Sequence, residues 1–437
     1  SQIRAMTGAH TRFVWAQDAG EKSDPMGERS EMRLIGFDTD DSLGERPVLS
    51  EISNYTKPML TPKGDRIVFS NRSERTVYVV NWDGSGLQKV ADGFAADVWR
   101  DPESGVEWVY LVRNYRKKNT APCRRVMIDN PKRRQRVWEK LDISYGWFGI
   151  SADGTRAAAA CPWPECGLAR LPNLTWKKYG KGCLPDIAPD NSYLFWIFDG
   201  PHRNLYLYGE GIAKGRRISI NNAPGIEGHE VYHPRWSNHV HFMTMTGPFM
   251  VGNAKTRVPA GGKAVEIYLG KFDTQFASIE DWIQITRNDR GDFYPDAWIE
   301  GGSESSIPPA VKEAFQIESA GRVADTEPAS TVVLQGRLQQ ITVTPEPKLI
   351  APYRRALVVY GYEVEKVFQG RCDEEEILVA HWAIRDGKIL PGLQERKAGG
   401  SFRLVLERFD DHPQLQSERL IMDTEDYSLP LFYDIEQ

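Results

Sequence analysis

The sequence predicts an all-β protein made of a six-bladed β-propeller and a small five-stranded barrel or sandwich. The main observation is a repeated phrase of the form X-Pro-x-apolar, which begins at Lys57, Leu184, His233 and Tyr294. A short polar turn and an apolar run follow each of the first three copies, and weaker copies near 97 and 145 fill the gap between the first and the second. Self-similarity at intervals of roughly forty to sixty residues, with turns between β-rich runs, is typical of a propeller.

Each copy is expected to open one blade. A proline at the first residue of an innermost strand removes no ladder hydrogen bond, because the backbone there faces the central channel. Turns such as 62–65 and 152–154 supply a glycine, which takes the positive φ of a hairpin turn without strain. The repeats then give five complete blades, near 57–90, 95–138, 145–179, 184–220 and 233–286.

The remaining strands predict a sixth blade built from both ends of the domain. Residues 293–299 provide an innermost strand with no partners after it. The N-terminus provides three strands with no innermost strand before them, at 11–15, 32–37 and 46–49. Joining these segments closes the ring and leaves no exposed sheet edge. The propeller is therefore expected to span residues 1–300, with 293–299 completing the N-terminal blade.

Residues 301–329 are expected to form a linker with one short helix. Glycine and serine at 301–306 and the two prolines at 308 and 309 interrupt the strand pattern. A helix is expected from Ala310 to Ser319, because Val311, Phe315 and Ile317 could then turn inward.

Residues 330–437 are expected to form the small all-β domain. Its apolar runs are 331–334, 356–360, 376–380, 402–406 and 419–422. The second run continues to Gly370 and resembles the long bent strand of an OB-type barrel. His381 and His412 have no cysteine or second histidine nearby for a metal site, so we expect a docking or assembly module rather than a catalytic one.

Two segments carry a resemblance to a known repeat. Residues 61–69 and the run 77–84 resemble the blade repeat of TolB-type propellers, which contain a Ser-Pro-Asp-Gly turn and an Asp-Gly turn. The similarity extends over roughly 11–299 and is best at two or three blades. It implies the propeller fold and an extracytoplasmic location, periplasmic or extracellular. It implies no reaction, since a fold alone carries no function.

A second resemblance is confined to one blade. Residues 233–237 and 240–249 are similar to the oligogalacturonate lyases, propeller enzymes with a His-Pro-x-x-Ser strand. Those enzymes bind a divalent metal through several histidines and remove the proton α to a uronate carboxylate. Met245 and Thr246 stand where the lyases carry His-Glu, so only His233 carries over by position. The resemblance implies a uronate-directed polysaccharide lyase as the enzyme alternative, with His233 and Tyr294 as its candidate catalytic residues.

One face of the propeller is predicted to hold the site. Loops that enter the innermost strands and loops that join second to third strands meet there, and the longest are 17–31, 114–122, 161–166, 200–203 and 247–262. Long loops above a channel mouth are a common place for ligand binding. The candidate ligand-binding residues at this mouth are Lys57, Asp97, His202, Arg203, His229 and Arg235.

The predicted function is recognition, through this long-loop face, of a protein partner or an acidic glycan. Arginine pairs with a carboxylate or sulfate in a bidentate manner, and histidine or tyrosine can act as a base. The main hypothesis is a non-catalytic recognition or scaffold module, which could be a subunit of a larger assembly. The lyase-like or other carbohydrate-active enzyme is the alternative.

No cofactor and no metal site are assigned. His239 is expected at the opposite turn and His241 in the middle of a strand, so a divalent metal would depend on His202, His229 and His233 with aspartate support. The disulfide state of Cys123, Cys161, Cys166 and Cys183 stays open: Cys161 and Cys166 could bridge at the top of a hairpin, or the cysteines could be buried or free thiols.

Charge and motifs exclude several partner classes. The formal net charge of −5 disfavours nucleic acid, and we expect the basic residues between 113 and 136 to form a solvated blade edge. The sequence contains no apolar run long enough for a membrane-spanning helix. It also lacks a nucleotide-binding loop, a Gly-x-Ser-x-Gly elbow and a His-Glu-x-x-His helix.

Overall fold

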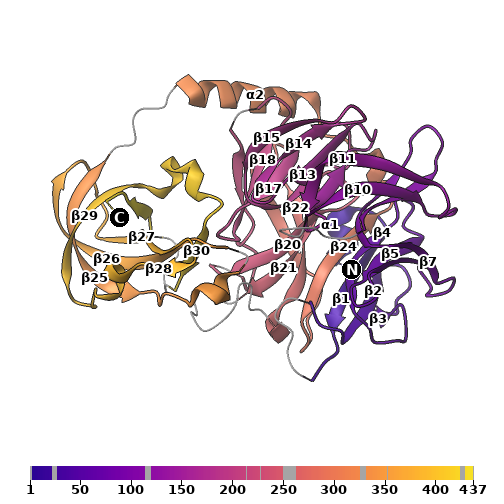
Figure 1. Cartoon of the computed structure of the whole chain (residues 1–437), viewed down its shortest axis with the longest axis horizontal. Helices are drawn as coiled ribbons and strands as arrows, with labels where there is room; N and C mark the ends of the chain where they lie inside the picture. The colour runs from indigo at the N-terminus through magenta and orange to yellow at the C-terminus, as the bar shows by residue number, and fades with distance from the viewer. Residues whose placement is uncertain are drawn as a thin grey trace.

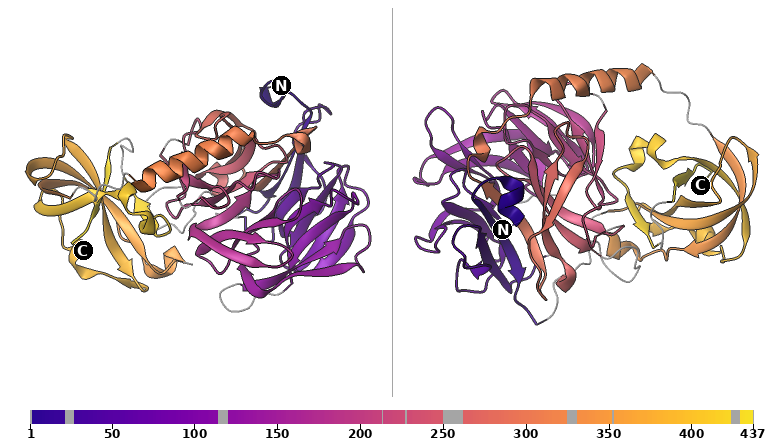
Figure 2. Two further views of the ribbon diagram at one scale, coloured as in Figure 1. Left: turned by 90° about the horizontal axis from the view of Figure 1, so that it is seen from above. Right: turned by 180° about the vertical axis from the view of Figure 1, so that it is seen from behind.

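Two lobes lie side by side in the computed structural model of the chain (Figure 1). The structure describes residues 2–21, 27–113, 120–212, 214–226, 228–249, 262–324, 331–351, 353–423 and 429–436. The larger lobe is the propeller, coloured indigo to orange, and the smaller lobe is the barrel, coloured orange to yellow (Figure 2). No helix of the described residues is long and apolar enough to cross a membrane.

Six four-stranded sheets form the propeller within the described residues, which confirms the predicted blade count. The first blade contains β24 (Asp292–Ile299), β1 (Thr11–Asp18), β2 (Met32–Asp38) and β3 (Arg46–Pro47). β24 pairs antiparallel with β1, Thr11 opposite Ile299, so the two ends of the domain share this sheet.

The other five blades follow the chain in order. The second has β4 (Tyr55–Leu60), β5 (Arg66–Asn71), β6 (Thr76–Asn81) and β7 (Gln88–Asp92). The third has β8 (Phe94–Arg100), β9 (Glu107–Val112), β10 (Thr120–Met127) and β11 (Arg134–Ser144). The fourth has β12 (Phe148–Ile150), β13 (Arg156–Ala160), β14 (Glu165–Arg170) and β15 (Thr175–Lys181). The fifth has β16 (Cys183–Ile187), β17 (Phe195–Phe198), β18 (Asn204–Tyr208) and β19 (Arg216–Ser219), and the sixth has β20 (Glu230–Trp236), β21 (Phe242–Phe249), β22 (Glu266–Phe272) and β23 (Ile279–Gln284).

The X-Pro phrase has a different structural role from the one expected. Each proline lies inside an innermost strand, at a β-bulge where the ladder register shifts, rather than at the first residue of the strand. The residue before it takes a left-handed backbone, with φ of 47° at Lys57, 43° at Leu184, 52° at His233 and 53° at Tyr294. A bulge re-aims a side chain and leaves one residue outside the ladder, which is where a proline is tolerated. The repeated phrase is therefore a bulge signal.

The smaller lobe is a closed five-stranded barrel. Its strands are β25 (Val332–Ile341), β26 (Ala356–Gln369), β27 (Glu376–Arg385), β29 (Ser401–Arg408) and β31 (Leu431–Asp434). They close in the order β25-β26-β27-β31-β29-β25, with β27 and β31 parallel, which is the strand order of OB-type barrels. The outer strands β28 (Lys388–Ile389) and β30 (Arg419–Met422) pair at the edges.

One predicted barrel strand therefore needs correction. Residues 419–422 do form a strand, β30, but it lies parallel to β26 and pairs with no second strand. The fifth barrel strand is β31, because it pairs with both β27 and β29 and buries Phe432 in the core.

The helices are short, apart from one. They are α1 (Gln2–Thr7), α2 (Pro309–Ala324) and α3 (Pro391–Gln394), with 3-10 turns η2 (Gly262–Ala264), η3 (Gly302–Glu304), η4 (Pro347–Ile350), η5 (Phe409–Asp411) and η6 (Pro413–Leu415). α2 buries Val311 and Phe315 against the propeller, and the Arg216 guanidinium lies 3.8 Å from the centre of the Phe315 ring. Ile317 is 73% exposed, contrary to its expected inward position, because it lies off the face that carries Val311 and Phe315.

All five cysteines are free thiols. The Cys161 thiol bonds to the carbonyl of Asp142 at 3.3 Å, and the Cys166 thiol bonds to that of Gly182 at 3.5 Å. The two sulfurs are thus turned to different neighbours. Of the two alternatives left open by the sequence, the structure shows the thiols.

Candidate functional site

A cavity of about 510 Å³ opens at the mouth of the propeller, where the innermost strands begin. Its wall includes the four left-handed residues of the X-Pro phrases, Lys57, Leu184, His233 and Tyr294. Ala351 and Tyr353 of the barrel domain also line it. Non-glycine residues held in the left-handed region are strained by about 1–3 kcal/mol each, and such strain collects at functional sites.

Five of the eight predicted site residues line this cavity: Lys57, Asp97, His233, Arg235 and Tyr294. The other three, His202, Arg203 and His229, do not belong to its wall. The centres of three predicted mouth loops, 22–26, 114–119 and 250–261, lie outside the described residues.

Arg235 lies at the centre of an ion network formed by several blades. Its Nε bonds to Asp296 Oδ1 at 2.9 Å, and one terminal nitrogen bonds to Asp97 Oδ1 at 3.3 Å. Two of its five donors are therefore used by carboxylates of the protein. Its binding of a glycan carboxylate stays a prediction, and such a carboxylate would compete with Asp296 and Asp97 for the same charge.

The carboxylates around Arg235 also join neighbouring blades. Asp296 of the first blade accepts from the Leu60 N–H at 2.7 Å, and Asp97 of the third accepts from the Ile150 N–H at 2.9 Å. Asp186 of the fifth accepts from the Trp236 N–H at 2.8 Å. Each bond crosses from one innermost strand to that of the next blade. These aspartates therefore hold the ring together as well as line its channel.

Burial makes the ionised form of these carboxylates less favourable. It raises the pKa of Asp186 to about 6, and it raises the pKa of Asp97 and of Asp296 despite the opposing charge of Arg235. At these carboxylates the loss of water therefore outweighs the stabilising charge of Arg235.

Lys57 reaches across the channel. Its Nζ donates to the carbonyl of Ala96 at 2.5 Å and to that of Gly146 at 3.2 Å. Burial, and then the charge of Arg235, lower the pKa of Lys57 to about 8. The ammonium group is therefore held by backbone oxygens, which leaves it little capacity for an anion.

The His233 ring offers one open acceptor. Thr246 Oγ1 donates to the carbonyl of Tyr232 at 3.0 Å, so it accepts from His233 Nδ1, 3.1 Å away. Nε2 then carries the lone pair, and it has no hydrogen-bond partner among the described residues. The side chain is 6% exposed, and burial lowers the pKa of His233 to about 3. The imidazole is thus neutral at physiological pH.

Aromatic rings complete the wall, and sequence reasoning did not include most of them. Tyr145 and Trp147 stack with centroids 4.7 Å apart, and the Tyr294 ring lies 4.1 Å from the His233 ring. Tyr232 also lines the cavity. The weak copy of the repeated phrase at 145–147 was the signal that could have identified Tyr145 and Trp147, because it takes the same place in its blade.

His202 lies in the contact between the two domains. It is fully buried, with Nδ1 3.2 Å from Glu230 Oε2 and Nε2 3.0 Å from the Tyr353 hydroxyl. Glu230 Oε1 also accepts from Arg419 of the barrel domain at 2.6 Å. The structure therefore places His202 against Glu230 and the barrel residue Tyr353, outside the cavity wall, and its binding of a ligand stays a prediction.

The other two residues outside the cavity have local partners. Arg203 is buried and its Nε donates to the carbonyl of Gly228 at 3.4 Å. The His229 ring bonds to the carbonyl of Ile226 at 3.1 Å. Because His202, His229 and His233 each have separate protein partners, they do not converge as metal ligands.

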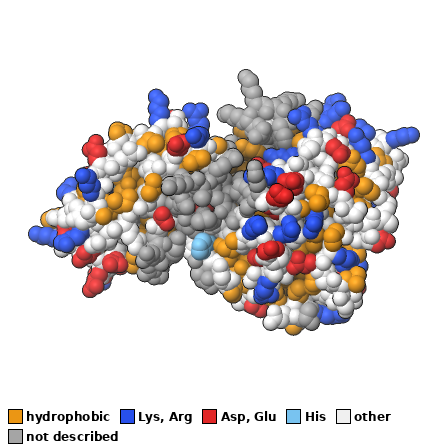
Figure 3. Space-filling model, turned by 90° about the horizontal axis from the view of Figure 1, so that it is seen from below, with side chains coloured by type: hydrophobic (Ala, Val, Ile, Leu, Met, Phe, Trp, Pro, Cys, Tyr) orange, Lys and Arg blue, Asp and Glu red, His pale blue; other side chains and the backbone are white. Residues whose placement is uncertain are grey.

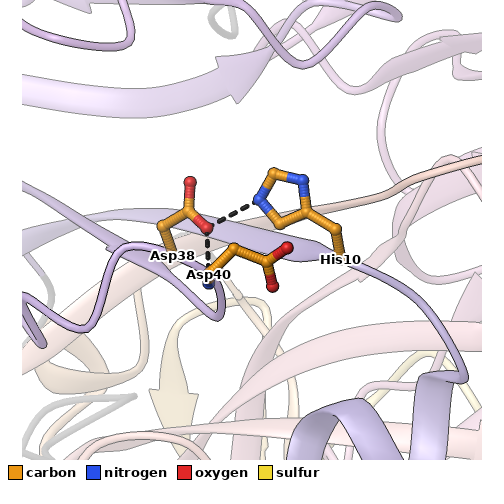
Figure 4. A group of neighbouring side chains, drawn as sticks. All are labelled: His10, Asp38 and Asp40. Atoms are coloured by element: carbon orange, nitrogen blue, oxygen red, sulfur yellow. Dashed lines mark hydrogen bonds and ion pairs between the residues drawn. The ribbon is translucent and has the colours of Figure 1, made fainter.

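A different group has the composition of a metal site. His10, Asp38 and Asp40 lie together at the outer end of the first blade (Figure 4). His10 Nε2 is 2.6 Å from Asp38 Oδ1, while Arg12 and Arg4 bond to Asp38 and Asp40 at 2.8 and 2.7 Å. Burial opposes ionisation of Asp38, but the hydrogen bonds from Arg12, the Asp40 backbone and His10 together outweigh it and lower the pKa. The two arginines already neutralise the carboxylates that a cation would need.

On the side drawn in Figure 3, the molecular surface has no large patch of charged side chains of a single sign. Lysine and arginine side chains are interspersed with aspartate and glutamate there. Such mixing is ordinary for a soluble surface and differs from the basic face of a nucleic-acid-binding protein.

Comparison with known proteins shows similarity in structure alone. No family model and no curated protein matches the sequence. TolB from Acinetobacter baumannii is similar in structure with 12% identity and a TM-score of 0.46, covering 68% of this chain and 69% of that chain. A putative TolB from Agrobacterium tumefaciens has 11% identity and a TM-score of 0.43, covering 68% and 95%. Kuenenia stuttgartiensis hydrazine synthase has 10% identity and a TM-score of 0.41, covering 80% and 52%. In fold, the chain is a six-bladed propeller followed by a closed five-stranded barrel.

Proposed function

We propose that the protein is a recognition or scaffold module whose propeller mouth binds a segment of a partner protein. The observation that carries this proposal is the cavity of about 510 Å³, whose wall includes five residues with a left-handed backbone: Lys57, Tyr145, Leu184, His233 and Tyr294. Their strain is of the kind that persists where a surface is built for binding. Stacked aromatic side chains around a few polar groups are also typical of recognition pockets.

The charges of the cavity favour a protein partner over an acidic glycan. Arg235 and Lys57, the cations that would have to bind a uronate, already donate to aspartates and to backbone carbonyls. A further anion would also lie close to Asp186, whose pKa burial raises to about 6. An acidic glycan would therefore gain little charge pairing here.

The lyase-like alternative receives less support from the geometry. A general base works best when its pKa lies near the working pH, whereas burial lowers the pKa of His233 to about 3. The neutral imidazole is a hydrogen-bond acceptor, but it is a weak base for a proton α to a carboxylate. Binding rather than proton abstraction suits this residue.

We also propose a periplasmic or extracellular location. Its support is the resemblance of residues 61–84 to TolB-type repeats. Fractionation of the cells that naturally make the protein tests the proposed location. Recovery of the protein with cytoplasmic markers would contradict it.

Photo-crosslinking tests the recognition proposal. A benzoylphenylalanine in place of Tyr145, at the cavity wall, should join the protein to one defined polypeptide in living cells. The matched control is the same residue at Leu87, which is 51% exposed in the turn between β6 and β7 at the opposite end of a blade. The cavity-filling variant Leu184→Trp should abolish the cross-link at 145. The same cross-linked products from positions 145 and 87, or no cross-linked product from position 145, would refute the proposal.

A further inference from the structure

We infer that the mouth cavity accepts a cationic side chain, the guanidinium of an arginine presented by the partner protein. This inference rests on the proposed function and names the group that is recognised. Three features of the cavity lead to it: an excess of carboxylates, an open acceptor and planar aromatic rings.

The charged side chains that line the cavity balance, and one further carboxylate lies behind its wall. At the rim, Arg72 and Glu28 pair at 3.0 Å. Deeper in the channel, Lys57 and Arg235 face Asp97 and Asp186 in the lining, and Asp296 contacts Arg235 from outside the lining. Within the described residues, this deeper set, with Asp296 included, has one carboxylate more than it has cations.

Burial is the main cause of the raised pKa of Asp186, Asp97 and Asp296, and the charge of Arg235 opposes it. Burial removes water from the carboxylates, and the cations present do not fully compensate for the loss. A third cation in the cavity would favour the ionised carboxylates, whereas an anion would oppose them.

His233 supplies the acceptor. Its Nε2 carries a lone pair, and His233 is only 6% exposed. This buried nitrogen has no hydrogen-bond partner among the described residues. A buried polar atom without a partner is destabilising, so such atoms in native proteins call for an explanation. A donor from the ligand would satisfy it. A carboxylate or sulfate of a ligand would instead place a second hydrogen-bond acceptor against His233 Nε2.

The aromatic wall favours a planar cation. Tyr145, Trp147, Tyr232 and Tyr294 line the cavity, and the first two already stack on each other. A guanidinium stacks on aromatic faces and has five donors in a fixed fork, so it can bond to His233 Nε2 while its plane lies on a ring. An ammonium is more strongly hydrated and lacks the planar face.

Calorimetric titration with small probes tests the inference. N-acetyl-arginine amide should bind, and N-acetyl-citrulline amide, its uncharged counterpart of nearly equal shape, should bind at least about tenfold more weakly. Trigalacturonate serves as the acidic-glycan probe and should bind more weakly than the arginine probe. Equal binding of the arginine and citrulline probes, or tighter binding of trigalacturonate, would overturn the inference.

Two variants locate the binding. His233→Asn, which keeps a residue tolerant of the left-handed backbone, should weaken binding of the arginine probe by about tenfold. His239→Asn, at the turn before β21 on the opposite end of the blade, is the matched control and should leave binding unchanged. Lys57→Met removes a competing cation and should strengthen binding by about threefold or more. Weaker binding in Lys57→Met would contradict the charge argument, and circular dichroism checks that each variant folds.

The two proposals fail in distinguishable ways. If N-acetyl-arginine amide does not bind but the cross-link at Tyr145 still forms, the cation inference is wrong and partner recognition stands. If neither is observed, both are wrong.

Discussion

One buried ion pair joins the propeller to the barrel, and its removal should weaken the protein strongly. Arg419 bonds to Glu230 Oε1 at 2.6 Å, with side-chain exposures of 4% and 1%. Glu230→Gln keeps the shape of the side chain but leaves the Arg419 charge buried without its counter-ion. Removing one partner of a buried pair lowers stability by about 3–5 kcal/mol.

The pKa of Glu230 gives a second estimate of the same order. Burial opposes its ionisation, but the charge of Arg419 and the hydrogen bond with His202 lower its pKa from 4.5 to about 2. At about 1.36 kcal/mol for each pKa unit, the folded protein favours the ionised Glu230 by about 3 kcal/mol. The two estimates agree, so we expect a loss of about 3 kcal/mol in the free energy of unfolding.

Urea unfolding followed by far-UV circular dichroism measures this loss. The matched control is Arg217→Met, because Arg217 also joins the domains through Asp410, at 2.7 Å, but with exposures of 49% and 69%. An exposed pair contributes about 0–1 kcal/mol. The double variant Glu230→Gln/Arg419→Met should be less destabilised than the two single losses added together. A loss in Glu230→Gln no greater than in Arg217→Met would refute the reasoning.

Acid should remove the advantage of Glu230. Because its folded pKa of about 2 lies below the unfolded value of 4.5, the stability it provides is present above pH 4.5 and is lost as pH falls toward 2. The stability difference between wild type and Glu230→Gln should therefore shrink over this range, and a constant difference would contradict the assignment. The α2 helix provides a further prediction: Phe315→Ala, at a buried position, should lower the free energy of unfolding by about 3–5 kcal/mol. Ile317→Ala, at a 73% exposed position, should change it by less than about 0.5 kcal/mol, so equal effects in urea unfolding would contradict the placement of the helix.

The propeller could be predicted from sequence because its signal is local and repeated. The phrases at Lys57, Leu184, His233 and Tyr294 recur with the period of the blades, and each contains the residues that form its own bulge. The count of six blades is confirmed. The bulge itself was not foreseen, since a proline before an apolar run reads equally well as the start of a strand.

Part of the site depended on contacts that sequence does not show. The loop at 200–203 was expected at the mouth, but the barrel packs there and buries His202 against Tyr353. No local pattern reports how a second domain docks. For the same reason β31, a run of only four residues, was missed although it closes the barrel through two partners.

The charge balance of the cavity was also a matter of tertiary structure. Arg235 was predicted to bind a ligand because arginine commonly pairs with anions. The structure places Asp296 and Asp97, distant in sequence, against its nitrogens. The same residue types that suggested an anion site therefore form an internal ion network, and the open group is His233 Nε2 instead.

A crystal structure of the full chain with N-acetyl-arginine amide tests the central claim, that the propeller mouth is the recognition site, most directly. The account predicts the probe within the cavity, with a guanidinium nitrogen at hydrogen-bond distance from His233 Nε2 and its plane on one of the aromatic rings. An ordered probe elsewhere on the protein, with the cavity closed by side chains, would contradict it.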